Sequence, residues 1–382
     1  MFELRTHLIE AARGLRRAIH RHPELGYQET DTTETVATAL DVPGITLTRR
    51  PGTGLIADVG SVGPRVAFRA DLDALPIHEL ADVAFASETP GVMHACGHDA
   101  HTAIGVAIAR HLAGMELPGR VRFLFQPAEE SFPGGAQLLV DEHVLNDVSS
   151  ILAFHVDPSL EVGKVGIRAG AITSSSDRFE IMLSGPGGHT ARPHETVDLL
   201  HAAGRMLTDL PGQFARSIDA RIPIAMVFGR IAGGSADNVI PTEVHMSGTC
   251  RVLDEPTWQS IPDRLERLVQ AIVSPTGAIA KLTYCRGIAP VVNDPAILAT
   301  AGAAIEGELG AGSAVGTDAS MGAEDFSCYL QKIPGALLRL GAWDGVSEKT
   351  ALHSAFFTID ERAIETGVRA GVASLLALLT AD

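Results

Sequence analysis

Three histidines, one cysteine and one aspartate stand within ten residues of this chain, Met93-His94-Ala95-Cys96-Gly97-His98-Asp99-Ala100-His101-Thr102. Cys96 and His98 lie two positions apart around a glycine, so a loop can turn a thiolate and an imidazole toward one cation. The stretch therefore indicates one half of a metal site, whose remaining ligands must come from elsewhere in the chain.

The same stretch also fits a polar helix entry. In that interpretation Asp99 caps a helix that continues through the apolar residues after Thr102, and the histidines are merely solvated. The spacing alone does not decide between a metal loop and a helix entry.

Length and composition limit the kinds of protein that this chain can be. A chain of 382 residues, 46% of them hydrophobic, exceeds the size of a single core and predicts two domains or three. The formal net charge of -16 argues against nucleic acid or an anionic membrane as a partner, because both need a basic face. Small-molecule chemistry is the better expectation.

The first residues of the chain and the number of its cysteines indicate the cellular compartment in which the protein is expected. The first ten residues hold no apolar core of signal-peptide length, and no later apolar run reaches membrane-spanning length without a charge. The 4 cysteines are too few and too dispersed for a disulfide framework. We therefore expect a soluble, cytoplasmic protein in which Cys96 is available as a thiolate.

Strand-like and helical patterns alternate in the first half of the chain. An amphipathic helix opens the chain, with apolar residues at helical spacing from Leu4 to Ile19. This alternation predicts an α/β sheet with helices on both faces. The strand-like runs lie at 54–59, 65–70, 121–125 and 151–154.

Polar residues follow three of these runs. They form the segments 71–73, 126–130 and 155–157. Ligands in open α/β sheets collect beyond the carboxyl ends of the strands, so these segments should converge with the Cys96 loop. That convergence favours the metal interpretation over the helix entry.

The pattern changes near Asp177, where four strand-like runs alternate with two helical patterns at 196–208 and 256–273. Four strands and two helices in that order predict a compact inserted α+β unit. A strand-like run at 336–340 and a closing helix at 360–379 then resume the first domain. The expected domains are a catalytic domain at 1–176 and 288–382 and an inserted domain at 177–287.

Glu129 and Glu130 are adjacent, which directs their carboxylates differently. One can bind a metal while the other serves as general base toward a bound water. Adjacent glutamates are usually a solvated surface pair, but these follow an apolar strand and a Gln-Pro turn, which favours the catalytic interpretation. His155 is a candidate ligand only beside the others, because a lone histidine at a strand end is more often a core residue.

Four residues farther along the chain are weaker candidates. His189 stands in a glycine-rich loop, where the backbone can approach a ligand closely. Asn238 can donate a hydrogen bond from its amide, and Arg251 offers the planar fork that suits a carboxylate. His353 lies far along the chain from the other candidates, as a final ligand would in a site that folding assembles from separate segments. Each of them alone would more often be structural.

Motifs that run in order over nearly the whole chain carry a family resemblance. They are HRHPELG (20–26), RADLDALP (69–76), MHACGHDAHT (93–102), QPAEE (126–130), HVDP (155–158), GGHTARPH (187–194), NVIP (238–241), GTCR (248–251), MGAEDFS (321–327) and LH (352–353). With these motifs the chain resembles the aminoacylase, hippurate hydrolase and auxin-conjugate amidohydrolase branch of the carboxypeptidase-like dinuclear metallohydrolases.

The resemblance implies an α/β fold: a mixed-sheet metallopeptidase catalytic domain of the phosphorylase/hydrolase-like kind, with an inserted α+β, ferredoxin-like domain as lid and dimerisation surface. It implies a homodimer with two divalent ions per subunit, zinc, manganese, cobalt or nickel. Glu129 becomes the general base, while His189 reaches the partner subunit's site and polarises the scissile carbonyl with Asn238. The implied metal ligands are Cys96, as the bridge, His98, Glu130, His155 and His353.

We therefore expect metal-activated water to hydrolyse the amide bond of an N-acyl amino acid, N-acetyl, N-benzoyl or similar, with Arg251 holding the substrate carboxylate. A dipeptidase, a carboxypeptidase or a deacetylase of the N-acetyl-diaminopimelate type would use the same site. A thiol hydrolase would use Cys96 as nucleophile with His98 or His101 as base. A non-catalytic relative would bind a ligand in the same cleft.

Overall fold

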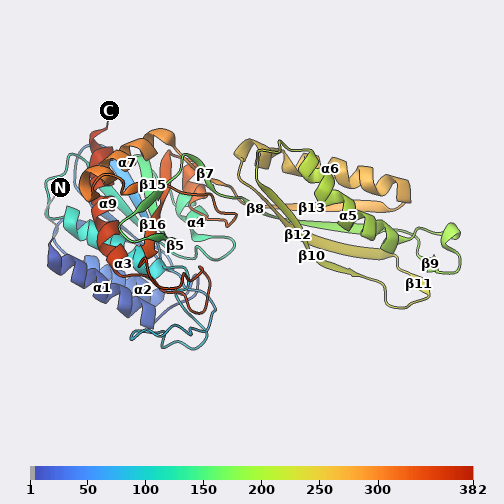
Figure 1. Ribbon diagram of the computed structural model, residues 1–382, viewed down its shortest axis with the longest axis horizontal. Coiled ribbons are helices and arrows are strands. Elements are labelled where there is room, and N and C mark those ends of the chain that lie inside the picture. Colours follow the sequence, from blue (N-terminus) through green and yellow to red (C-terminus); the bar gives the residue numbers. More distant parts are fainter. Residues whose placement is uncertain (1–4, 382) are drawn as a thin grey trace. The chain divides into compact units, whose positions relative to one another are not determined.

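The computed structural model describes residues 5–381 and divides into two compact units, which are coloured along the chain in Figure 1. Leu4, which the predicted opening helix includes, lies outside the described residues. Unit 1 is drawn from Met1–Gly170, Val292–Asp318 and Asp325–Asp382, and unit 2 from Ala171–Val291 and Ala319–Glu324. The short second segment of unit 2 lies within the range that the sequence assigns to the catalytic domain.

Eight strands form the main sheet of unit 1: β1 (Ile45–Arg49), β2 (Leu55–Val59), β3 (Arg65–Asp71), β4 (Arg120–Gln126), β5 (Val148–Glu161), β6 (Val165–Ile167), β15 (Ala314–Gly316) and β16 (Gly335–Trp343). Their order is β1-β2-β4-β3-β5-β16-β6-β15. β4, β3, β5 and β16 are parallel neighbours, whereas β1, β2 and β6 pair antiparallel, so the sheet is mixed. The predicted strands are confirmed as β2 to β5 and β16, whereas β1, β6 and β15 were not predicted.

The central strands are buried on both faces, as parallel strands are when helices cover the sheet. Residues 66–71 of β3 and 151–156 of β5 are buried without interruption. In the register of the sheet Asp71 lies opposite Gln126, so β3 and β4 end together. The polar residues that follow them therefore start from the same edge of the sheet.

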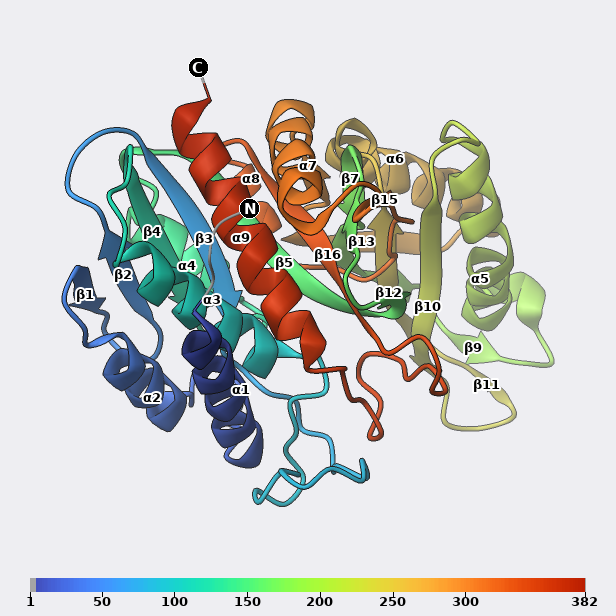
Figure 2. The same ribbon diagram turned by 60° about the vertical axis from the view of Figure 1, so that its left-hand side comes forward.

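Close packing of two helices covers one face of this sheet. A Cβ added at Gly367 would lie 2.7 Å from Ile104 Cδ1, and one at Gly371 would lie 2.4 Å from Ile108 Cδ1. The two glycines therefore let α9 (Arg362–Thr380) approach α3 (His98–Leu112) closely. The same face carries α1 (Thr6–Arg21), α2 (Thr30–Leu40) and α7 (Pro295–Leu309), and α4 (Gly135–Asp141) and α8 (Ser327–Leu330) lie behind the sheet (Figure 2).

α9 is also long and apolar enough to cross a membrane by length and composition, with a mean hydropathy of 1.4 over its best window. However, 67% of that window is buried inside the structure. The helix packs against α3, α7 and β16 of the same unit. Its apolar character is therefore accounted for by the core of unit 1.

Unit 2 is an antiparallel sheet with the order β10-β12-β8-β13, packed against two helices. Aspartates begin both helices: Asp198 accepts from the backbone of His201 at 3.0 Å, and Asp254 accepts from Thr257 at 2.8 Å. This confirms the predicted order of four strands and two helices. The elements are β8 (Ser176–Ser184), α5 (Leu199–Arg216), β10 (Ile224–Gly233), β12 (Glu243–Val252), α6 (Glu255–Val273) and β13 (Ile279–Ile288).

Smaller elements complete both units. In unit 2, β9 (Gly188–His189) pairs antiparallel with β11 (Val239–Ile240), and this two-stranded sheet is called the β9–β11 sheet below. β7 (Gly170–Thr173) and β14 (Val291–Asn293) lie where the chain passes between the two units, and 3-10 turns occupy Pro193–Glu195 and Ser274–Thr276. Each unit has its own hydrophobic core.

Candidate metal centre

The Cys96 loop makes its turn at Gly97. This glycine has a φ of 83°, and a Cβ there would lie 2.4 Å from Val156 Cγ2, so only glycine fits. α3 begins at the next residue, and both Cys96 and His98 are buried. Asp99 does not cap α3 with its side chain, and the histidines are not solvated. The helix-entry interpretation is therefore wrong in both respects.

Two histidines of this centre hold their Nδ1 atoms against backbone oxygens. His98 Nδ1 lies 2.8 Å from the backbone oxygen of Asp73, and His155 Nδ1 lies 2.8 Å from that of Val156. Each Nδ1–H donates to a carbonyl, so each Nε2 keeps its lone pair. Among residues 5–381, His98 Nε2 has no hydrogen-bond partner although it is buried. Metal-ligating histidines commonly have this arrangement.

The donor atoms form two groups that share Cys96. Within each group all donors lie within 4.8 Å of one another. Cys96 Sγ is 3.4 Å from His155 Nε2, and His353 Nε2 is 2.9 Å from Glu130 Oε1. Thiolate, imidazole and carboxylate donors with an orphaned buried nitrogen fit a pair of divalent cations. The groups are Cys96, His98 and His155, and Cys96, Glu130 and His353.

Burial differs across the centre. The His98 side chain is fully buried, whereas the side chain of His353 is 51% exposed. The group of Cys96, His98 and His155 therefore lies deep in unit 1, and the group with His353 faces solvent. A small molecule would approach from the side of His353.

The turn after β4 directs the two glutamates. Ala128 has a φ of 54°, and Asp73 accepts from the backbone nitrogens of Glu129 at 3.0 Å and Glu130 at 2.9 Å. The Glu129 side chain is 9% exposed, and its Oε2 lies 4.0 Å from His98 Nε2. Glu129 therefore stands beside His98, with which it and Glu130 form a further group of close donors, while Glu130 also belongs to the group of Cys96 and His353.

His101 lies among these residues, but both of its nitrogens are engaged. Its Nδ1 is 2.7 Å from Asp71 Oδ1, and its Nε2 accepts from the backbone nitrogen of Val156 at 2.9 Å. Burial opposes ionisation of Asp71, but Arg69 and the neighbouring histidines outweigh it and hold the pKa of Asp71 well below its usual range. His101 therefore links α3 to β5 and leaves no lone pair for a metal.

A second buried network holds the first turn of α3. The carboxylate of Asp99 accepts from Arg16 Nε at 2.9 Å and lies 2.8 Å from His20 Nδ1, while His20 Nε2 lies 3.0 Å from Glu79. Burial alone would lower the pKa of His20, but the charges and hydrogen bonds of Asp99 and Glu79 outweigh it and raise that pKa to about 9. Arg16 and His20 thus anchor the first turn of α3 from α1.

The stability that His20 provides should depend on pH. Its pKa is raised from 6.5 in the unfolded chain to about 9, so its contribution is full below pH 6.5 and is lost as the pH rises through 9. We expect His20→Gln to lower the free energy of unfolding by about 3 kcal/mol at pH 6, and by much less above pH 9. Denaturant titrations of the wild type and the variant across this pH range measure the difference in the free energy of unfolding. A difference that does not change with pH would refute the pairing of a charged His20 with Asp99.

The thiol-hydrolase alternative depends on an ionised Cys96. Burial raises the pKa of the Cys96 thiol to about 12, although His98 lowers it in part. A buried thiol of this kind is a poor free nucleophile, whereas a bound cation would stabilise its thiolate. The geometry favours Cys96 as a ligand.

The three candidates in unit 2 lie at its β9–β11 sheet and on its larger sheet. His189 and Asn238 are exposed, and Asn238 O accepts from the backbone nitrogen of Thr190 at 3.2 Å. His189 Nδ1 accepts from the backbone nitrogen of Ala191 at 3.0 Å, which places the ring proton on Nε2. Arg251 Nη1 donates to the backbone oxygen of Met321 at 3.0 Å, within the same unit. The pairing of β9 with β11 therefore brings His189 and Asn238 together, whereas Arg251 lies on β12.

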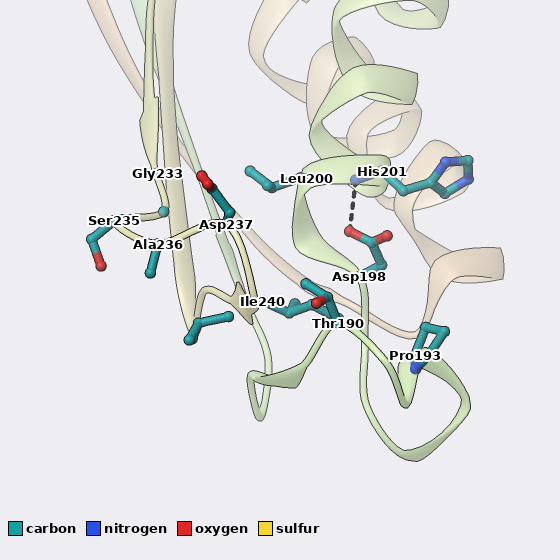
Figure 3. Close-up of a pocket in the computed structure, with 12 residues that line it drawn as sticks. Thr190, Pro193, Asp198, Leu200, His201, Gly233, Ser235, Ala236, Asp237 and Ile240 are labelled. Carbon is teal, nitrogen blue, oxygen red and sulfur yellow. Dashed lines mark hydrogen bonds between the residues drawn. The ribbon is translucent and has the colours of Figure 1, made fainter.

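A cavity of about 790 Å³ lies beside the β9–β11 sheet, between the loop at 233–237 and the start of α5. Figure 3 shows Thr190 and Ile240 at this cavity, and Asp198 bonded to the backbone of His201. None of the proposed metal donors lines it. The cavity is a separate feature of unit 2.

Comparison with known proteins decides the family. The model of peptidase family M20/M25/M40 matches residues 67–377. The chain belongs to this family. The matched range includes parts of both units and every candidate site residue.

Relatives in the M20 family carry related names. A Bacillus subtilis protein named N-acetylcysteine deacetylase is 38% identical over 92% of this chain and 92% of its own. The N-acyl-L-amino acid amidohydrolase of Geobacillus stearothermophilus is 40% identical over 73% of this chain and 76% of its own. The crystal structure of the Bacillus subtilis YXEP protein, a dinuclear metal-binding M20 peptidase, has a TM-score of 0.87, with 33% identity over 98% of this chain and 99% of that one.

A longer relative has a different name. The chain is 44% identical over 94% of its length to a Rhodococcus jostii protein provisionally named glutamate–cysteine ligase 2-3, but it spans only 45% of that protein. The ligase name therefore describes a protein about twice as long.

The comparisons confirm the family resemblance and the fold class, a mixed-sheet M20 catalytic fold with a smaller α+β domain. They also confirm the prediction of a hydrolase that acts on amide bonds. The roles of individual residues and the domain boundaries stay predictions.

Proposed function

We propose that this M20 protein hydrolyses N-acyl-L-amino acids to a carboxylic acid and a free amino acid, with two divalent ions per subunit. The observation that carries the proposal is the pair of donor groups that share Cys96, with Glu129 beside them. The names of the deacetylase and amidohydrolase relatives support N-acetyl and similar amides as substrates.

The proposed ligands divide the cations between them. His98 and His155 would hold one ion and Glu130 and His353 the other, with Cys96 belonging to both groups. A pair of ions held there would supply Lewis acidity toward a water and the acyl carbonyl. The mixed donor set suits zinc, manganese, cobalt or nickel and does not select one of them.

Glu129 is the proton carrier of the proposed reaction. Its carboxylate takes a proton from the attacking water and later gives it to the departing nitrogen. Asp73 supports this role, because it accepts hydrogen bonds from the backbone of Glu129 and Glu130 and so fixes the position of the base.

Two residues at the β9–β11 sheet of unit 2 are proposed to stabilise the oxyanion. His189 carries its proton on Nε2, so the neutral ring can donate a hydrogen bond from that atom. Asn238 adds its amide. Arg251 is proposed to bind the substrate carboxylate, since guanidinium donors remain beside the one bonded to Met321. The unit that carries these residues serves as lid and dimerisation surface in this proposal.

Mixing two inactive variants tests whether His189 acts in the partner subunit. Glu129→Gln removes the base and His189→Ala removes the donor, so each homodimer should be inactive. A hybrid dimer would hold one site with both residues intact, and we expect the mixture to recover up to about a quarter of wild-type activity. Native mass spectrometry verifies subunit exchange, and exchange without recovery would refute a shared site.

A substrate screen tests the function itself. The purified protein is incubated with N-acetyl and N-benzoyl amino acids, with dipeptides and with N-acetyl-diaminopimelate, each with zinc, manganese, cobalt or nickel. We expect metal-dependent release of free amino acid from the N-acyl amino acids. Faster cleavage of dipeptides would instead favour a peptidase. We further propose that the protein acts in the cytoplasm on a small-molecule substrate.

A further inference from the structure

Three consecutive backbone N–H groups of the turn after β4 donate to buried carboxylates. Those of Glu129 and Glu130 donate to Asp73, and that of Ala128 donates to Glu29 Oε1 at 2.7 Å. Ala128 is in the left-handed region, with a φ of 54°, which alanine rarely adopts unless its surroundings hold it there. The first residue of the turn is therefore fixed by a side chain from another element.

The side chain of Glu29 binds the backbone of Ala128 and does not cap α2, the helix that follows Glu29. It stands at the N-cap position of α2, yet its side chain makes no cap hydrogen bond. The residue is fully buried, and its second oxygen accepts from Thr53 Oγ1 at 2.7 Å. Each carboxylate oxygen therefore has a donor, which fixes the orientation of the group.

The turn is confined on its other sides as well. Ala128 O accepts from the backbone nitrogen of Gly135 at 3.0 Å, and a Cβ at Gly135 would lie 1.9 Å from Pro127 O. A Cβ at Gly26 would lie 3.2 Å from Ala128 Cα. With backbone packed so closely, a change at Glu29 is transmitted to the next residues of the turn.

We propose that Glu29 is a positioning residue for Glu129 and Glu130, an inference that rests on the proposed function of these two glutamates. Glu29 holds Ala128 in its left-handed conformation, and this sets the directions in which the base and the metal ligand leave the turn. It touches neither substrate nor metal. Its effect should therefore appear both in turnover and in metal affinity.

Glu29→Gln tests the proposal, because glutamine has the same size but loses the charge and one acceptor oxygen. We expect kcat to fall about 10- to 100-fold with little change in KM, and the affinity for zinc to fall about 10-fold. Competition with a chromophoric chelator measures that affinity without any substrate. The matched control is Glu24→Gln, since Glu24 also accepts from two backbone nitrogens, those of Asp31 and Thr32 at 3.1 and 2.8 Å, but these nitrogens belong to the first turn of α2.

Glu24→Gln should leave both quantities at the wild-type values. If Glu29→Gln only lowers the melting temperature, with kcat and zinc affinity unchanged when measured well below it, the proposal is overturned. If Glu29→Gln does not fold, Thr53→Val decides: removal of the hydroxyl that anchors Glu29 should weaken zinc binding about 3-fold, and an unchanged affinity overturns the proposal. A wild-type protein without amidohydrolase activity would refute the proposed function, while the zinc affinities would still test Glu29.

Discussion

Glu129→Gln is expected to lower kcat about 10²- to 10⁴-fold while the protein keeps its fold and its metals. Glutamine cannot accept a proton from water, and it fits the same space beside His98. Because Glu129 is not a proposed ligand, metal content should match that of the wild type. Steady-state kinetics on an N-acetyl amino acid and elemental analysis of the same sample measure both quantities.

Glu116→Gln is a suitable control for this substitution, because Glu116 is exposed on the same unit and belongs to neither donor group. It should retain wild-type kinetics. If Glu129→Gln kept full turnover, Glu129 would not be the base, and the assignment of the adjacent pair would have to be reversed or abandoned.

Glu130→Ala should differ from Glu129→Gln in its affinity for metal. Glu130 Oε1 lies 2.9 Å from His353 Nε2 in one donor group, so its removal leaves that group with two donors. We expect the affinity for one of the two ions to fall more than about 100-fold, and turnover to fall with it. Calorimetric titration of the metal-free variant with zinc measures the loss.

Excess metal distinguishes the two glutamates. High zinc should restore part of the turnover of Glu130→Ala, since a weakened site can still fill, but none of the turnover of Glu129→Gln. An unchanged zinc affinity in Glu130→Ala would contradict its role as a ligand.

Much of the fold and of the metal centre could be predicted from local patterns. β3, β4 and β5 are continuous apolar runs, and parallel neighbours end at one edge, so Asp71, Gln126 and His155 could be assigned to one region before any coordinates. The loop could be predicted from the glycine between Cys96 and His98. Only glycine fits the turn that the loop makes at Gly97.

Other features depend on tertiary contacts that no local pattern carries. Asp99 looked like a helix cap, but Arg16 and His20 from a distant helix bind its carboxylate. Glu29 before Thr30 resembles an ordinary helix start, and nothing in its neighbourhood indicates that it reaches Ala128. α2 was not predicted, since its threonines are weak helix formers and its apolar periodicity is slight.

The central claim is that hydrolysis requires cations held by the two donor groups around Cys96. Its most direct test is a titration of the metal-free protein with zinc, with the rate of amide hydrolysis of an N-acetyl amino acid recorded at each addition. We expect the rate to begin near zero and to level off at two ions per chain. Full activity in the metal-free protein, or a rate that does not respond to added zinc, would contradict it.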